Sequence, residues 1–206
     1  MAELTFYTNP MSRGAIVRWM LEEVGAPYET VVLDYGTTMK EPEYLAINPM
    51  GKVPAIRHGD LVVTEGAAIC TYLADAFPEA GLAPAPGSKE RGPYYRWLFY
   101  GAGPVEAAII DKALGVDVPD DKKMMVGYGS YDTVVDVLDQ HFSANQWAAG
   151  NSFTAADVYL GSQIVWGTQF GTLPKRDSFD AYVDRLTSRP AALRAQEIDA
   201  KLRPEG

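Results

Sequence analysis

The sequence predicts a two-part α/β protein in which a small mixed-sheet domain precedes an all-helical domain. Within residues 1–78, short β-prone runs alternate with segments whose apolar residues recur at the helical period. Residues 79–88 are rich in proline and glycine and are typical of a linker. Beyond the linker the strand signals stop, and residues 89–206 carry helical patterns. We therefore expect domains at 1–78 and 89–206.

The first domain has the element order β-α-β-(α)-β-β-α. Its strands are expected at 4–7, 28–33, 54–58 and 61–64, and its helices at 12–24, 42–46 and 65–77. Ser12 can cap the first helix, and Gly25 stops it. The first crossover implies parallel pairing, whereas Gly59-Asp60 fits a two-residue antiparallel hairpin. The result is a small mixed sheet.

The second domain is expected to consist of helices alone. They are placed at 89–114, at 122–142, from 154 onward, at 180–188 and at 191–202. Gly101-Ala102-Gly103-Pro104 is expected to interrupt the first of them, because glycine and proline are poor helix formers. The two short helices at the end flank Pro190.

Composition and charge exclude several classes of function. The 206 residues carry a net charge of −9, so a nucleic-acid-binding surface is not expected. The single cysteine, Cys70, cannot form an internal disulfide or supply a zinc cluster, which favours a reducing cytoplasm and no metal. No run of 18 apolar residues is present, so we expect no membrane span, and Met1-Ala2-Glu3 does not resemble a secretory signal.

Three junctions between strand and helix carry the candidate functional residues. Pro54 opens a strand in either the trans or the cis form, and the cis form would leave the Val53 backbone free to pair with a peptide ligand. Glu65 opens a helix, either as a favourable charge or as part of an anion site with the N–H groups of Gly66 and Ala67. Ser12 is either a simple cap or a donor to an anion. These junctions should converge on one end of the sheet.

The combination of segments resembles the cytosolic glutathione transferases of bacterial type. The resemblance rests on residues 6–14, 21–29, 48–56, 64–73 and 152–157, which occur in the family's order in both halves of the chain. Asn48-Pro49-Met50-Gly51-Lys52-Val53-Pro54 followed by the Glu65 helix is highly specific in combination. The resemblance implies a thioredoxin-like first domain, a helical second domain, and a structural capping box formed by Thr154 and Asp157.

The same resemblance implies where glutathione binds. It implies a cis Pro54, pairing of the Val53 backbone with the cysteinyl part, and binding of the γ-glutamyl end by Glu65 and its neighbours Gly66 and Ala67. Lys52 would lie near the glycyl carboxylate or on the same rim. The family often has serine where this chain has Gly66, so one hydroxyl contact is lost and affinity for glutathione should fall.

The residue that contacts the glutathione sulfur has three candidates. Alignment on the Met-Ser that opens the first helix selects Ser12, whereas alignment on Arg18-Trp19 selects Tyr7. We favour Ser12 because it lies at a helix start, where a thiolate gains most, and Asn9 is the third candidate. No cysteine occupies this turn, which disfavours thiol-exchange chemistry.

The predicted function is conjugation of glutathione to small apolar electrophiles. Met11, Tyr100, Glu106 and Trp166 are the candidates for the electrophile pocket. The family resemblance also implies a homodimer with a role in detoxification, and glutathione and the electrophile are its small-molecule partners. The alternatives are another glutathione-dependent reaction (isomerisation, dehalogenation or ether cleavage) and a noncatalytic member that only binds glutathione or another ligand.

Overall fold

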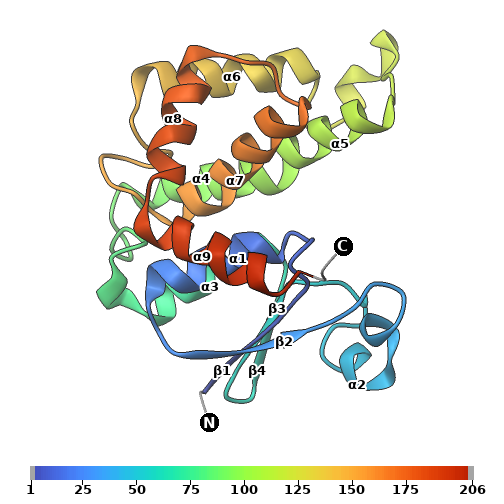
Figure 1. Cartoon of the computed structure of the whole chain (residues 1–206). Coiled ribbons are helices and arrows are strands. Elements are labelled where there is room, and N and C mark those ends of the chain that lie inside the picture. Colours follow the sequence, from blue (N-terminus) through green and yellow to red (C-terminus); the bar gives the residue numbers. More distant parts are fainter. Residues whose placement is uncertain (1–2, 204–206) are drawn as a thin grey trace. The chain divides into compact units, whose positions relative to one another are not determined.

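A four-stranded mixed sheet forms the centre of the first unit in this computed structural model, which describes residues 3–203 (Figure 1). The strands are β1 (Leu4–Thr8), β2 (Tyr28–Val32), β3 (Ala55–His58) and β4 (Leu61–Thr64). Their order is β2-β1-β3-β4; β1 and β2 are parallel, and the other two pairs are antiparallel. The predicted mixed sheet and the Gly59-Asp60 hairpin are confirmed.

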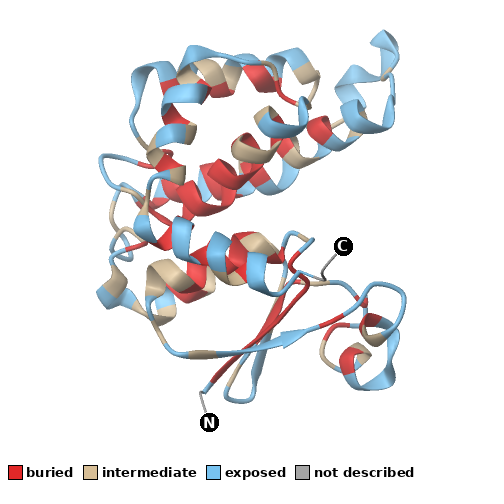
Figure 2. Cartoon of the chain, in the orientation of Figure 1, coloured by how far each residue is buried: buried red, intermediate tan, exposed pale blue. Residues whose placement is uncertain are grey.

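Side chains of β1 alternate between the two faces of the sheet. Phe6 lies on the face that carries α1, where the Arg18 guanidinium stands 4.9 Å from the centre of its ring. Tyr7 lies on the other face and belongs to a buried cluster with Leu33, Met39, Tyr44 and Ala55. The whole of β1 is buried, whereas the edge strand β2 is mostly exposed (Figure 2).

The helices of the first unit are mostly short. They are α1 (Gly14–Val24), η1 (Thr38–Lys40), α2 (Pro42–Leu45), α3 (Gly66–Ala76), η2 (Pro78–Ala80) and α9 (Pro190–Lys201). Gly25, with a φ of 73°, ends α1 as predicted, because glycine adopts this left-handed conformation without a steric cost. The start of α1 differs from the prediction: the helix begins at Gly14, two residues after Ser12.

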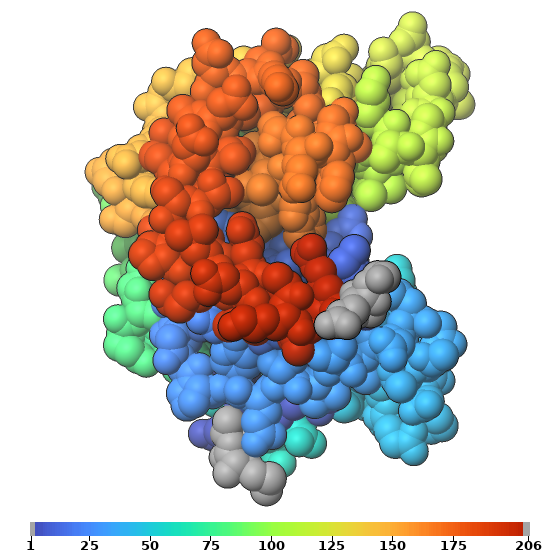
Figure 3. All heavy atoms as spheres, in the orientation of Figure 1, coloured from blue at the N-terminus to red at the C-terminus, as the bar shows by residue number. Residues whose placement is uncertain are grey.

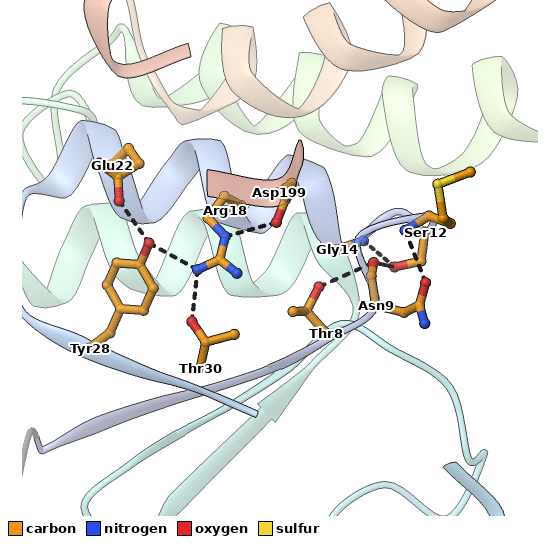
Figure 4. Close-up of polar contacts among 10 residues, drawn as sticks. Thr8, Asn9, Ser12, Gly14, Arg18, Glu22, Tyr28, Thr30 and Asp199 are labelled. Carbon is orange, nitrogen blue, oxygen red and sulfur yellow. Dashed lines mark hydrogen bonds and ion pairs between the residues drawn. The ribbon is translucent and has the colours of Figure 1, made fainter. Parts of the chain in front are cut away.

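The last helix, α9, belongs to the first unit, which comprises residues 3–82 and 188–203. The expected helical domain at 89–206 had included it. Buried Arg18 of α1 pairs with Asp199 of α9 at 3.0 Å and also donates to Tyr28 and Thr30 of β2, at 3.0 and 2.8 Å (Figure 4). In the space-filling view α9 lies at the surface of the first unit (Figure 3). The hydrogen bonds that hold α9 on the first unit join residues more than 160 positions apart in the sequence, so local sequence patterns do not predict them.

The second unit, residues 83–187, consists of helices. They are α4 (Arg91–Tyr100), η3 (Gly101–Val105), α5 (Glu106–Leu114), η4 (Asp120–Met125), α6 (Tyr131–Ala144), α7 (Ala155–Phe170) and α8 (Asp177–Thr187). The expected helix at 122–142 is wrong at its beginning. Residues 120–125 form a short 3-10 helix, Gly129 takes a left-handed turn with φ of 71°, and α6 begins only at Tyr131.

The expected break at Gly101–Pro104 is a π-helical segment that joins α4 to α5. Widening the helix accommodates Pro104, whose ring would otherwise meet the preceding turn.

In α7, Asp157 forms the predicted capping box with Thr154, whose backbone N–H donates to the Asp157 carboxylate at 2.9 Å. The same carboxylate accepts a hydrogen bond from Tyr182 of α8 at 2.8 Å. Burial raises the pKa of Asp157. Among residues 3–203, no helix has the length and apolar character needed to cross a membrane.

Candidate active site

Three loops meet at one end of the sheet of the first unit. The strand register pairs Tyr7 with Ala55, and Ala55 with Thr64. The turn after β1, the loop before β3 and the start of α3 after β4 therefore lie side by side, as the sequence predicts. The candidate residues Ser12, Val53 and Glu65 are carried by these three loops in that order. Elements of one compact unit thus bring them together.

The turn after β1 is built by the side chain of Asn9. Its amide nitrogen donates to the carbonyl of Leu33 at 2.8 Å, and its oxygen accepts from the backbone N–H of Met11 at 2.9 Å. Because both ends of this carboxamide bind backbone, Asn9 holds the turn in shape. The asparagine is buried, whereas Met11 is 64% exposed.

Ser12 lies half-buried in this turn, with its hydroxyl between two backbone groups (Figure 4). The hydroxyl donates to the carbonyl of Asn9 at 2.7 Å and accepts from the N–H of Gly14 at 2.9 Å. The oxygen therefore satisfies the first amide of α1, although Arg13 occupies the formal N-cap position. At Gly14, two residues after Ser12, a side chain would clash, because a Cβ there would stand 2.0 Å from the hydroxyl oxygen of Thr8.

Tyr7, the alternative to Ser12, lies within the packed face of the sheet. Its side chain is 7% exposed, and its ring packs against that of Tyr44 with centroids 5.7 Å apart. Desolvation by burial raises the pKa of Tyr44, the phenol beside Tyr7, to about 12.

The loop before β3 is held by donors from three different side chains. Tyr44 and Asn48 donate to the carbonyl of Lys52, at 2.6 and 2.7 Å, and Lys40 donates to the carbonyl of Gly51 at 2.8 Å. The bond between Val53 and Pro54 is cis, as the resemblance implies. The side chain of Lys52 is exposed. The sequence does not predict that Lys40 helps to hold this loop, because nothing in the residues around this lysine indicates which group it binds.

Glu65 holds an unusual backbone conformation at the start of α3. Its φ is 68° and its ψ is 118°, although residues with a Cβ rarely adopt a positive φ. Its carbonyl accepts from Ile69 at 2.9 Å, and its exposed side chain makes no capping bond to the helix. The amides of Gly66 and Ala67 therefore lie outside the hydrogen-bond ladder of α3, where they can bind an anion.

The electrophile-pocket candidates are divided between the two units. Met11 belongs to the first unit, and Tyr100, Glu106 and Trp166 belong to the second, where all three are half-buried. Tyr100 and Glu106 flank the π-helical segment η3, and the ring of Tyr100 stands edge-on to that of Trp97, 5.4 Å away. Burial raises the pKa of Tyr100.

Comparisons with known proteins agree with this arrangement. A family model described as the N-terminal domain of glutathione S-transferase matches residues 2–75. The chain is 31% identical to glutathione S-transferase 3 of Zea mays over 77% of this chain and 75% of the relative. It is 27% identical to glutathione S-transferase GST-4.5 of Xanthomonas campestris, with 98% and 99% covered.

Solved structures give the same result across both units. A glutathione transferase of Methylococcus capsulatus superposes with a TM-score of 0.79 at 27% identity, covering 96% of this chain and 99% of that one. A sphingomonad glutathione S-transferase complexed with glutathione superposes with a TM-score of 0.78 at 28% identity, covering 95% and 98%. The predicted combination of a thioredoxin-like domain and a helical domain is confirmed.

Proposed function

This chain belongs to the glutathione S-transferase family, and on that premise we propose that it conjugates the glutathione thiolate to small apolar electrophiles. The observation that carries the proposal is the meeting of the Ser12 turn, the Val53-Pro54 loop and the Glu65 helix start at one end of the sheet. Glutathione is a peptide with carboxylates at both ends, so a free backbone edge beside a helix start suits it.

Glutathione is assigned to these loops as follows. Its cysteinyl part pairs with the backbone of Val53, and its α-carboxylate accepts from the amides of Gly66 and Ala67. The Glu65 carboxylate accepts from the α-amine, and the exposed Lys52 faces the glycyl carboxylate. The solved sphingomonad enzyme complexed with glutathione supports glutathione as the co-substrate.

The proposed role of Ser12 is to stabilise the thiolate. A free thiol has a pKa of roughly 8.5, so only about 3% is ionised at pH 7. Lowering that pKa by about two units requires about 2.7 kcal/mol. A hydroxyl bond to an anion supplies roughly 1.5–3 kcal/mol, and the start of α1 adds up to about 1 kcal/mol. The hydroxyl hydrogen must turn from the Asn9 carbonyl toward the sulfur, and the Gly14 amide keeps the oxygen in place meanwhile.

Three observations favour Ser12 over its alternatives. Both ends of the Asn9 carboxamide already bind backbone groups, so turning it toward sulfur would dismantle the turn. Tyr7 packs in the cluster with Tyr44 and Met39. Ser12 is the one of the three that is half-buried and not buried, and its hydroxyl rotates about a single bond.

Substitution of Ser12 tests the catalytic assignment. Ser12→Ala should raise the pKa of the bound thiol, and the thiolate should lose roughly 10- to 150-fold in stability, with glutathione affinity nearly unchanged. The defect should shrink as the pH rises, because the free thiol then ionises unaided. Tyr7→Phe is the control: a pH-dependent loss in that variant and none in Ser12→Ala would reverse the two roles. If neither variant shows the pH-dependent loss of turnover, the sulfur is bound by backbone amides or by the Asn9 side chain.

Substitution of Glu65 tests the binding assignment. Glu65→Ala should weaken glutathione binding tenfold or more, about 1.4 kcal/mol, because a charged hydrogen bond is lost. Calorimetric titration with glutathione measures this, and an unchanged dissociation constant would refute the placement. Glutathione binding with no turnover of any electrophile would instead favour the noncatalytic alternative, which the missing hydroxyl at Gly66 also favours.

The proposal also covers the electrophile pocket, the oligomeric state and the cellular location. Met11, Tyr100, Glu106 and Trp166 are assigned to the electrophile pocket, and the enzyme is expected to be a cytoplasmic homodimer that detoxifies electrophiles. Light scattering at micromolar concentration tests the dimer, and a monomer mass would contradict it. Single substitutions of the pocket residues should change the preference among electrophiles and leave glutathione affinity unaltered.

A further inference from the structure

The tripeptide Asn-Pro-Met occurs twice in the first unit, and both copies form the same turn. In each copy the asparagine oxygen accepts from the backbone N–H of the methionine two residues later, at 2.9 Å for Asn9 with Met11 and at 3.1 Å for Asn48 with Met50. The amide nitrogen of each asparagine donates to a backbone carbonyl outside the tripeptide, at 2.8 and 2.7 Å. Both asparagines are buried, so buried side chains fix the shape of both turns.

Both turns present their methionine to solvent at the same end of the sheet. Met11 and Met50 are each 64% exposed. Met11 directly precedes Ser12, and Met50 lies three residues before Val53 in the loop before β3. The two loops lie side by side, because β1 and β3 are paired. Two exposed thioethers are therefore carried by the loops to which we assign the glutathione sulfur and the cysteinyl backbone.

The other sulfur atoms described in this unit are shielded from solvent. Met20 and Met39 are buried in the core. The single cysteine, Cys70, is buried as well, and burial raises the pKa of its thiol, so little of the reactive thiolate is present. Oxidation of a sulfur atom requires that the oxidant reach it. In the described part of the first unit, a dissolved oxidant therefore reaches the methionines of the two Asn-Pro-Met turns first.

We propose that Met11 and Met50 are sites at which peroxides oxidise this protein, and that their sulfoxides hinder the binding of apolar electrophiles. A sulfur lone pair forms a bond to one oxygen of hydrogen peroxide, the O–O bond breaks, and the other oxygen leaves as water with both protons. The thioether is oxidised to a sulfoxide, and the peroxide is reduced. The polar S=O group costs free energy where it must be covered by an apolar ligand. The effect on conjugation rests on the proposed function, whereas the oxidation itself does not.

Peptide mapping by mass spectrometry after graded treatment with hydrogen peroxide tests the sites. In the folded protein, Met11 and Met50 should be converted to sulfoxides well before the buried Met20 and Met39. In denaturant all four should react at similar rates, because the protection comes from the fold. If either Met11 or Met50 is as slow to react in the folded protein as the two buried methionines, the assignment is overturned.

Activity measured after the peroxide is removed with catalase tests the consequence. In the wild type, kcat/KM for benzyl bromide should fall roughly 2- to 30-fold through a higher KM for this electrophile. The two methionine sulfoxide reductases, one for each configuration at sulfur, should restore it. The double variant Met11→Leu/Met50→Leu should keep its own untreated value after peroxide, because leucine has no sulfur to oxidise.

A matched pair of methionines in the second unit provides the control. Met124 and Met125 are even more exposed, so they are oxidised too, but they lie outside the loops of the first unit. Met124→Leu/Met125→Leu should therefore lose activity as the wild type does. If this variant is protected, if the loss persists in Met11→Leu/Met50→Leu, or if the fully oxidised wild type loses nothing, the consequence is refuted. If the untreated protein conjugates no electrophile, the proposed function fails, and the peptide map alone decides the oxidation sites.

Discussion

The ion pair between Arg18 and Asp199 should hold α9 on the first unit, and Asp199→Ala tests this. The Arg18 side chain is 1% exposed and that of Asp199 is 5% exposed. The substitution leaves the guanidinium with two neutral partners, the hydroxyls of Tyr28 and Thr30. One of its nitrogens, Nη2, already has no hydrogen-bond partner among the described residues. A buried cation would then be without its counter-charge.

The structure indicates a large effect. Removing one partner of a buried pair costs roughly 3–5 kcal/mol, because the remaining charge is uncompensated. Desolvation by burial raises the pKa of Asp199 and outweighs the opposing effect of the neighbouring Arg18, so we expect a loss at the lower end of that range. The pair of Arg194 with Glu22 joins the same two helices, but Arg194 is 52% exposed, so Arg194→Ala should cost only about 0.2–1 kcal/mol.

Denaturant unfolding and hydrogen exchange measure the difference. Asp199→Ala should lower the free energy of unfolding by about 3 kcal/mol and speed amide exchange throughout α9 and along α1. Asp199→Asn should fall between the wild type and the alanine variant, because its amide oxygen still accepts from the Arg18 Nε. If Asp199→Ala and Arg194→Ala lower the free energy of unfolding by the same amount, the reasoning is refuted, because burial would then not affect how much an ion pair stabilises the protein.

Three further outcomes are expected. Burial lowers the pKa of His141 below its usual 6.5. As the pH falls below 6.5, the unfolded chain therefore binds a proton at His141 before the folded chain does. The melting temperature should fall over the range from pH 6.5 down to the pKa of the folded state. His141→Gln, which can still donate to the Trp147 carbonyl, should flatten that pH dependence in calorimetry. Gly14→Ala should cost about 1–3 kcal/mol in thermal unfolding, and Thr8→Ala in the same chain should restore much of it, because the added Cβ meets the Thr8 hydroxyl. Glu65→Gly should stabilise the fold by about 1 kcal/mol while weakening glutathione binding in titration, since glycine adopts the positive φ freely but lacks the carboxylate.

Local chemistry predicted much of the first unit. The Gly25 stop and the Gly59-Asp60 hairpin each depend on residues within a few positions of one another, and the structure contains both. The convergence of the three loops followed from strand pairing, which alternation and turn residues indicate well. The start of α1 was misplaced, because the Asn9 side chain builds a turn before the helix that propensities do not describe.

Contacts between distant residues account for what the sequence did not reveal. Lys40 donates to backbone carbonyls of the loop before β3, and Tyr35, in the loop that follows β2, donates to the backbone carbonyl of Met11. Neither contact can be predicted from the type or the spacing of the residues involved. The assignment of α9 depends on pairs such as Arg189 with Glu23, at 2.6 Å, in which both charges look like ordinary surface residues when read along the chain.

The placement of α9 also determines the order in which the protein can fold during synthesis. Arg18 leaves the ribosome early, but Asp199 follows only after residues 83–187 have been made. Those residues form one continuous unit that can fold as soon as it emerges, whereas the first unit waits for its last helix. Until then, the α1 surface that α9 will cover stays exposed, with the Arg18 charge still unpaired. The unit that contains the sheet, although first in the sequence, is therefore the last to be completed.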